Sequence, residues 1–162
     1  MDDHGSAVLR RLLEVQGEAV LETHARLGDA TARLAPQRLV EVMRWLRDDP
    51  ELAFDMLMDL TAVDYLGREP RFEVVMHLYS LSRGHRLRIK VAVTEGEAEL
   101  DSLCEIWPSA NWMEREVFDL YGIRFRGHPD LRRILLYDSF QGHPLRKDYP
   151  KERRQPLVGP NN

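Results

Sequence analysis

Two carboxylates, Glu116 and Asp119, stand three residues apart in the last third of the chain. On a helix this spacing places both on one face, where such a pair could act as a general acid and base or as two metal ligands. Arg115 precedes Asp119 by one helical turn, however, and opposite charges at i and i+4 form a common ion pair on helices. The pattern therefore favours a structural ion pair between Arg115 and Asp119, and we assign no catalytic role to either carboxylate.

Imidazole and carboxylate side chains also follow this point, and together they could form a zinc or manganese site. They are His128, Asp130, Asp138, His143 and Asp148. Each of the two histidines precedes a proline in a Gly-His-Pro turn, where the ring more often hydrogen-bonds the backbone. We therefore expect no metal centre here. Cys104 is interpreted as a small core residue.

Two basic pairs, Arg132-Arg133 and Arg146-Lys147, could bind phosphate or nucleic acid. A nucleic-acid-binding module usually has a basic face with interleaved aromatic residues, whereas this chain is acidic overall. Charge-assisted docking onto acidic patches of a partner protein is the better use for these cations.

The composition limits the possible classes of protein. The chain has 162 residues, one cysteine and a formal net charge of -4. At about 150 residues per domain it fits one domain. One cysteine excludes an intramolecular disulfide and an all-cysteine iron–sulfur cluster. We read neither a membrane span nor a signal sequence, so we expect a cytoplasmic protein. Residues 1–113 carry 13 basic and 20 acidic residues, whereas residues 114–162 carry 10 and 7.

The elements that position these residues follow from hydrophobic periodicity. Asn111 and Glu114 have capping-box spacing at the start of a helix that Gly122 ends, and Gly28 lies at a hairpin turn. Antiparallel hairpins with helices on one face predict an α+β fold with a mixed, largely antiparallel sheet. The expected helices cover residues 6–14, 36–48, 97–107 and 112–121, and the expected strands cover residues 19–25, 30–34, 54–63, 71–79 and 86–91.

The pattern changes after residue 123, where no sustained period remains. The segment 124–150 is longer than an ordinary connecting loop in a compact domain, and it contains too many apolar residues for a solvated tail. We expect a globular domain over residues 1–123, an extended arm that docks on a partner over residues 124–150, and a flexible tail over residues 151–162. The alternative is an arm folded back on its own domain.

A long sequence pattern runs through this region. It reads Glu114-Arg115-Glu116-Val117-Phe118-Asp119-Leu120-Tyr121-Gly122, then His128-Pro129-Asp130-Leu131-Arg132-Arg133-Ile134-Leu135, then Gly142-His143-Pro144-Leu145-Arg146-Lys147-Asp148-Tyr149-Pro150. The pattern resembles the signature of the 30 kDa (C-type) subunit family of proton-pumping NADH:quinone oxidoreductase, respiratory complex I. Tyr137 stands where a proline is usual and Phe140 where a tryptophan is common, and both changes keep a bulky apolar group.

The resemblance implies a cofactor-free structural and assembly subunit in the peripheral arm of that complex. It would contact the 49 kDa (D-type) subunit and neighbouring iron–sulfur subunits near the quinone-reducing module. FMN and iron–sulfur clusters would lie in other subunits, and this chain would have no activity of its own. The expected location is the cytoplasmic side of the bacterial inner membrane, reached only through the complex. The charged, glycine and proline residues of the signature would then serve docking.

Two alternatives remain open. The first is the equivalent subunit of a membrane-bound hydrogenase or of a coenzyme F420- or ferredoxin-driven complex. The second is a stand-alone small metal-dependent enzyme that uses Glu116, Asp119 and His128.

Overall fold

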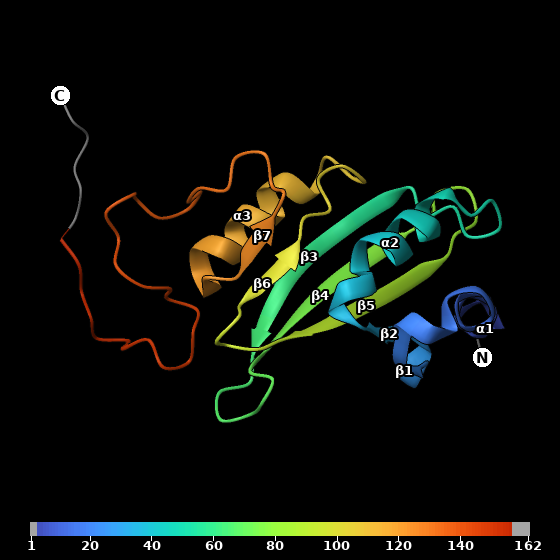
Figure 1. Cartoon of the computed structure of the whole chain (residues 1–162), viewed down its shortest axis with the longest axis horizontal. Helices are drawn as coiled ribbons and strands as arrows, with labels where there is room; N and C mark the ends of the chain where they lie inside the picture. Colours follow the sequence, from blue (N-terminus) through green and yellow to red (C-terminus); the bar gives the residue numbers. More distant parts are fainter. Residues whose placement is uncertain (1–2, 157–162) are drawn as a thin grey trace.

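The computed structural model describes residues 3–156 and has an α+β fold. Its main sheet has five strands in the order β1-β2-β5-β4-β3, and a separate pair joins β6 to β7. Figure 1 shows α2 crossing one face of the main sheet, with α3 beside the β6–β7 pair. The α+β class and the largely antiparallel sheet are confirmed. The α-helices of the described residues are α1 (Asp3–Gln16), α2 (Leu39–Asp48) and α3 (Ala110–Tyr121), and short 3-10 helices cover Gly17–Ala19, Arg26–Gly28 and Pro36–Arg38.

Strand pairing in the main sheet follows the hairpins expected from the sequence. Strands β3 (Met56–Asp64), β4 (Phe72–Tyr79) and β5 (Arg86–Val93) pair antiparallel in succession, and the β4–β5 hairpin is confirmed. Strands β1 (Val20–His24) and β2 (Thr31–Leu34) form the predicted N-terminal hairpin, and β2 joins β5 in the single parallel pair of this sheet.

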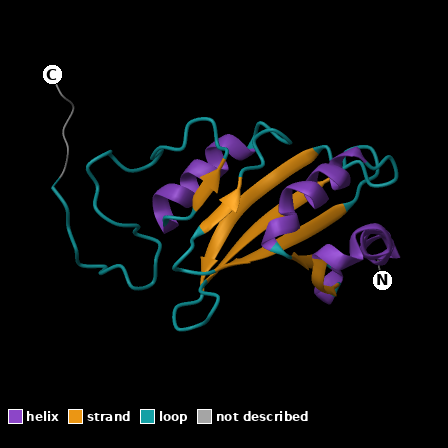
Figure 2. Cartoon of the chain, viewed as in Figure 1, coloured by secondary structure: helices purple, strands orange, loops and turns teal. Residues whose placement is uncertain are grey.

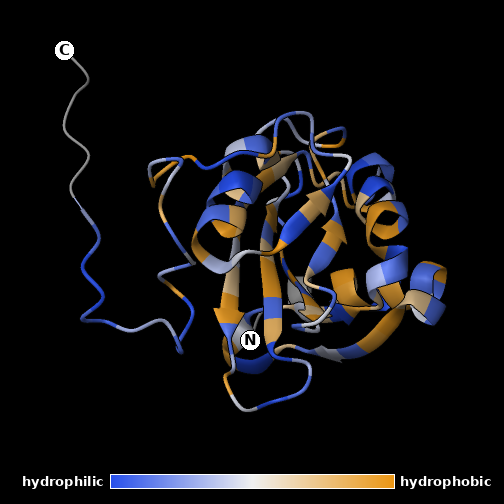
Figure 3. Cartoon of the chain, turned by 60° about the vertical axis from the view of Figure 1, so that its left-hand side comes forward, coloured by the Kyte–Doolittle hydropathy of each residue, from blue (hydrophilic) through white to orange (hydrophobic). Residues whose placement is uncertain are grey.

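The core lies between this sheet and its helices. Along β5, Leu87, Ile89 and Val91 are buried, while the residues between them face away from the core. Figure 3 shows this alternation of apolar and polar residues along the strands. The helix predicted over residues 36–48 contains α2, on which Leu39, Val42, Met43 and Leu46 form a buried stripe at helical spacing. Burying each such side chain stabilises the fold by about 1.5–3 kcal/mol.

The helix predicted over residues 97–107 is wrong. Its residues 99–101 form strand β6 (Glu99–Asp101), which pairs parallel with β7 (Arg124–Arg126). Beyond β6, the amides of Ile106 and Trp107 both bind the Leu103 carbonyl in a single turn. The buried residues of this stretch have the spacing of a helical stripe, but they belong to a strand and the turn that follows it. They are Leu100, Leu103, Ile106 and Trp107.

The start of α3 also differs from the prediction. Asn111 lies inside the helix, and Ser109 at the N-cap makes no side-chain capping bond. Glu114 does not cap the helix because its side chain is buried against the segment that follows β6. Gly122 ends the helix as predicted, with a φ of 75°. A side chain there would collide with His143, since an added Cβ would lie 2.5 Å from its Nε2.

After β7 the described chain forms no further helix or strand up to residue 156, and Figure 2 shows this long loop segment. Among residues 3–156, no helix combines the length and apolarity needed to cross a bilayer. The tail predicted over residues 151–162 lies partly outside the described residues.

Candidate functional site

The signature residues meet in a cluster around Asp119, whose exposed fraction is 0%. This Asp119 cluster comprises Asp119, Arg133, His143 and the backbone of residues 134–136. Asp119 Oδ1 accepts a hydrogen bond of 2.6 Å from Arg133 Nη1. Its Oδ2 accepts bonds from three successive backbone N–H groups, at 3.1, 2.9 and 2.9 Å. Burial raises the pKa of Asp119, but these donors outweigh it and hold the pKa below its ordinary value.

The ion pair predicted between Arg115 and Asp119 is wrong. Arg115 instead donates to the backbone carbonyl oxygens of Arg132 and Arg133, at 3.1 and 3.0 Å. Asp119 is buried and Glu116 is exposed, so the two carboxylates do not share a solvated face. Helical spacing pointed to Arg115, on the same helix, as the partner of Asp119. The donors that bind Asp119 are instead Arg133, 14 residues further along the chain, and the three N–H groups of residues 134–136.

Arg133 extends this cluster to the next turn of the chain. Its Nη2 donates to the carbonyl oxygens of Phe140 and Gly142, at 3.0 and 3.1 Å. His143 Nδ1 donates to the Asp119 carbonyl oxygen at 2.9 Å, and burial lowers the pKa of His143. The cluster therefore fixes both ends of residues 133–143 against α3.

A second cluster holds the following stretch against the main sheet. This Arg71 cluster comprises Arg71, Asp64, Glu95 and Asp148, and Arg71 is only 4% exposed. Arg71 binds both oxygens of Asp64, at 2.9 and 2.8 Å, and both oxygens of Asp148, at 2.9 and 2.7 Å. Its Nη1 also lies 2.7 Å from Glu95. These carboxylates raise the pKa of Arg71, and the guanidinium lowers those of Asp64 and Asp148.

The backbone and a further arginine strengthen this attachment. The Lys147 amide donates to Asp64 Oδ2 at 2.8 Å, and the Leu145 amide donates to the Leu120 carbonyl at 3.1 Å. Arg146 Nε donates to the Tyr121 carbonyl at 2.6 Å. Sequence reasoning missed Arg71, Asp64 and Glu95 as site residues. A lone arginine at the start of a strand carries no local signal of a partner 77 residues away.

The sequence also did not anticipate a third cluster around Glu114, another buried signature carboxylate. Glu114 Oε2 accepts from Ser102 Oγ and Oε1 accepts from the Leu103 amide, both at 2.7 Å. Burial raises the pKa of Glu114 despite these bonds. Glu114 thus holds the β6 segment against α3.

Cys104, Glu114 and His128 each place a potential metal ligand atom within 4.8 Å of the others. His128 Nε2 bonds the Asn111 carbonyl at 3.0 Å, however, and its Nδ1 accepts from the Asp130 amide at 3.0 Å. Burial raises the pKa of Cys104 to about 11, so the free thiol is protonated at neutral pH and is a poor nucleophile. A metal ion would have to displace bonds already made.

The five residues first considered as metal ligands do not form such a group in the described part of the chain. His143 binds α3, Asp148 binds Arg71, and Asp130 pairs with Arg132 at the surface, at 2.8 Å. Pro129 and Pro144 lie in the turns that carry the two histidines. Gly142 has a φ of 92°, and an added Cβ would lie 2.9 Å from the Tyr149 ring.

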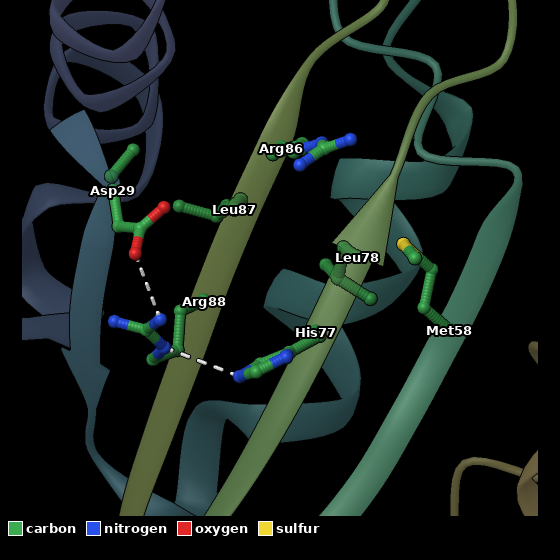
Figure 4. Close-up of a pocket in the computed structure, with 8 residues that line it drawn as sticks. Asp29, Met58, His77, Leu78, Arg86, Leu87 and Arg88 are labelled. Carbon is green, nitrogen blue, oxygen red and sulfur yellow. Dashed lines mark hydrogen bonds and ion pairs between the residues drawn. The ribbon is translucent and has the colours of Figure 1, made fainter.

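Outside these clusters, the face of β5 that carries Arg86 and Arg88 has a hollow of about 240 Å³ (Figure 4). Figure 4 shows Arg88 between Asp29 and His77, and the bonds measure 3.1 and 3.2 Å. The Arg88 cation is therefore already paired within the chain.

The geometry is that of a protein that uses its charged residues to hold its own C-terminal segment. Comparison with known families gives the same assignment as the signature. Residues 32–155 match the family model of the respiratory-chain NADH dehydrogenase 30 kDa subunit.

Curated relatives agree over nearly the whole chain. The C-type subunit of NADH-quinone oxidoreductase from Roseiflexus castenholzii is 52% identical over 143 residues, which cover 88% of this chain and 82% of that protein. The same subunit from Geotalea uraniireducens is 45% identical over 161 residues, covering 98% and 96%.

Solved structures agree in fold. A trypsin-resistant fragment of Nqo5 superposes with a TM-score of 0.68 at 35% identity, covering 76% of this chain and 98% of that one. A chain of an archaeal membrane-bound sulfane sulfur reductase has a TM-score of 0.77 at 22% identity, covering 91% and 86%, which shows the shared fold alone. The chain belongs to the 30 kDa subunit family of respiratory-chain NADH dehydrogenase, which is the C-type subunit family of NADH-quinone oxidoreductase.

Proposed function

We propose that this chain is a cofactor-free structural and assembly subunit in the peripheral arm of NADH-quinone oxidoreductase. It braces the quinone-reducing module and takes part in electron transfer from NADH to quinone only as part of the complex. The observation that carries this proposal is the Asp119 cluster. There a buried signature carboxylate directs its hydrogen bonds to Arg133 and the backbone of residues 134–136. Such a group shapes a surface and does not face a substrate, since its exposed fraction is 0%.

The remaining signature groups support a chain without its own cofactor. Glu114 and His128 are engaged with the backbone. FMN and iron–sulfur clusters then belong to other subunits. This arrangement disfavours the stand-alone metal-dependent enzyme, since Glu116 is exposed and Asp119 is engaged within the chain.

We assign partner docking to residues 124–150, with the 49 kDa (D-type) subunit and the neighbouring iron–sulfur subunits as partners. The charged clusters hold this segment against its own domain, yet Leu135 and Leu145 remain exposed. Internal attachment and external docking are therefore compatible, because they use different sides of the same segment. Location on the cytoplasmic side of the bacterial inner membrane then follows from assembly with those partners.

The test is affinity purification of the tagged full-length chain under mild detergent, followed by identification of the co-purifying proteins. Flavin- and iron–sulfur-type subunits together with the 49 kDa-type subunit, and NADH-dependent quinone reduction by the preparation, are the expected result. A nickel–iron large subunit in their place would move the chain to a hydrogenase. Turnover by the isolated chain, or a metal bound to it in stoichiometric amount, would contradict the structural role.

A further inference from the structure

An apolar groove runs between the N-terminal half of α3 and residues 134–135. It has a volume of about 810 Å³, and its apolar walls include Pro108, Trp112, Met113, Ile134 and Leu135. Trp112 is 70% exposed and Leu135 is 61% exposed. Exposed apolar residues that gather in one groove, unlike scattered ones, mark interaction sites, and a central tryptophan is a frequent energetic hot spot.

Residues 134–135, which form the wall of this groove opposite α3, are held in place by hydrogen bonds to α3. The backbone amides of Ile134 and Leu135 are bound to Asp119, and Arg115 binds the carbonyl oxygens of the two residues before them. These bonds hold the main chain in place, so the groove exists before any partner arrives. A preformed groove binds more tightly because less conformational entropy is lost on association.

Charge identifies the kind of partner. Glu116 is the one charged residue lining the groove, it is exposed, and no ion pair to it forms within residues 3–156. An acidic group at the rim of an apolar groove complements a cation that lies beside an apolar side chain. At the other end of the groove, Ser109 Oγ bonds the Leu57 carbonyl at 3.3 Å. Met56 and Met58 on either side of Leu57 are also exposed.

We propose that this groove receives a segment of a neighbouring subunit of the same complex. The segment places an aromatic or branched aliphatic side chain against Trp112 and a lysine or arginine opposite Glu116. This inference rests on the proposed function, because it requires that the chain be assembled with other subunits. Beyond the proposed function, the inference identifies the surface of this chain that binds the neighbouring subunit and the chemistry of the segment that binds there.

Photo-crosslinking in the assembled complex tests the position of the partner. Benzoylphenylalanine replaces Trp112 in one tagged chain and the exposed Leu81, in the β4–β5 turn, in a control chain. The expected result is one adduct at position 112, mapped to a peptide with a basic residue beside an aromatic or aliphatic one, and no such adduct from position 81. An assembled complex without an adduct at 112, or with an adduct on a peptide that lacks a basic residue, overturns the proposal that this groove binds a partner segment but leaves the proposed function intact. A chain that recovers no other subunit fails the proposed function itself.

Charge reversal tests the chemistry. Glu116→Lys should lower recovery of the neighbouring subunits by about tenfold or more, and Glu116→Gln by about threefold, because the lysine adds repulsion to the lost attraction. Glu97→Lys is the matched control, since Glu97 is also exposed and has no ion pair in the described chain. All three variants should melt as the unaltered chain does. Normal recovery with Glu116→Lys, or an equal loss with Glu97→Lys, overturns the proposal.

Discussion

The Asp119 and Arg71 clusters hold the same C-terminal segment by opposite means. In the first, a buried anion binds the backbone N–H groups of residues 134–136 and one arginine. In the second, a buried cation binds three carboxylates, and the side chains of Glu95 and Asp148 are each 48% exposed. Three successive backbone bonds fix the conformation of a segment, whereas the Arg71 cluster binds the half-exposed Asp148 side chain and the single backbone amide of Lys147 and so tethers it. We therefore expect the Asp119 cluster to shape residues 134–136 and the Arg71 cluster to anchor the end of the segment.

The largest expected effect comes from Arg71→Met, which should lower the free energy of unfolding by about 3–5 kcal/mol because Asp64 is left buried without its cation. Urea denaturation followed by circular dichroism measures this change. The double variant Arg71→Met with Asp64→Leu should recover most of the loss, since no buried charge remains. A single variant that loses less than about 1 kcal/mol would show that the buried ion pair contributes little.

Asp119→Asn should cost about 2–3 kcal/mol, because one amide oxygen replaces two charged acceptors facing Arg133 and three N–H groups. Hydrogen exchange should become faster at the amides of residues 134–136 while the Lys147 amide, which is bound to Asp64, stays protected. Glu116→Gln is the matched control, and its exposed carboxylate should contribute less than about 0.5 kcal/mol. Equal acceleration at Lys147 would mean that the two clusters act as one unit.

A fall in pH should weaken both clusters, because it protonates their carboxylates. The pKa values of Asp64, Asp119 and Asp148 are lowered in the folded chain, so the unfolded chain takes up protons first as the pH falls. Their stabilising effect is complete above the unfolded pKa, about 4, and is lost as the pH falls through the lower folded values. The pKa of Glu114 is raised, so its protonation opposes this loss. The stability difference between the unaltered chain and Asp119→Asn, about 2–3 kcal/mol at pH 7, should shrink progressively as the pH falls below about 4 in urea titrations.

The smallest effect is expected from Asp148→Asn, at no more than about 1 kcal/mol after solvent screening. Arg71 keeps Asp64 and Glu95, and the Lys147 amide keeps its bond to Asp64. Hydrogen exchange should report looser packing after residue 147 without any change at residues 134–136. A loss as large as that of Arg71→Met would assign the main anchoring role to Asp148.

Local periodicity was sufficient to predict most of the main sheet and α2, because burial on one face imposes a repeat that survives in the sequence. It failed over residues 97–107, where buried residues of a strand and a turn imitate a helix. The signature located the residue types of the site but not their pairing. Asp119 bonds Arg133 and Arg71 bonds Asp148, and both contacts depend on how distant segments meet rather than on local spacing.

Strand β7 bears on where this polypeptide could be divided. Phe125 is buried, and the parallel β6–β7 ladder means that residues 124–126 complete a sheet begun by residues 99–101. A gene fusion, a protease site or a shortened expression product placed right after Gly122 would strip a strand from the folded body, not merely release its trailing end. An engineered junction in this region belongs beyond Arg126, so that both strands stay on the same piece.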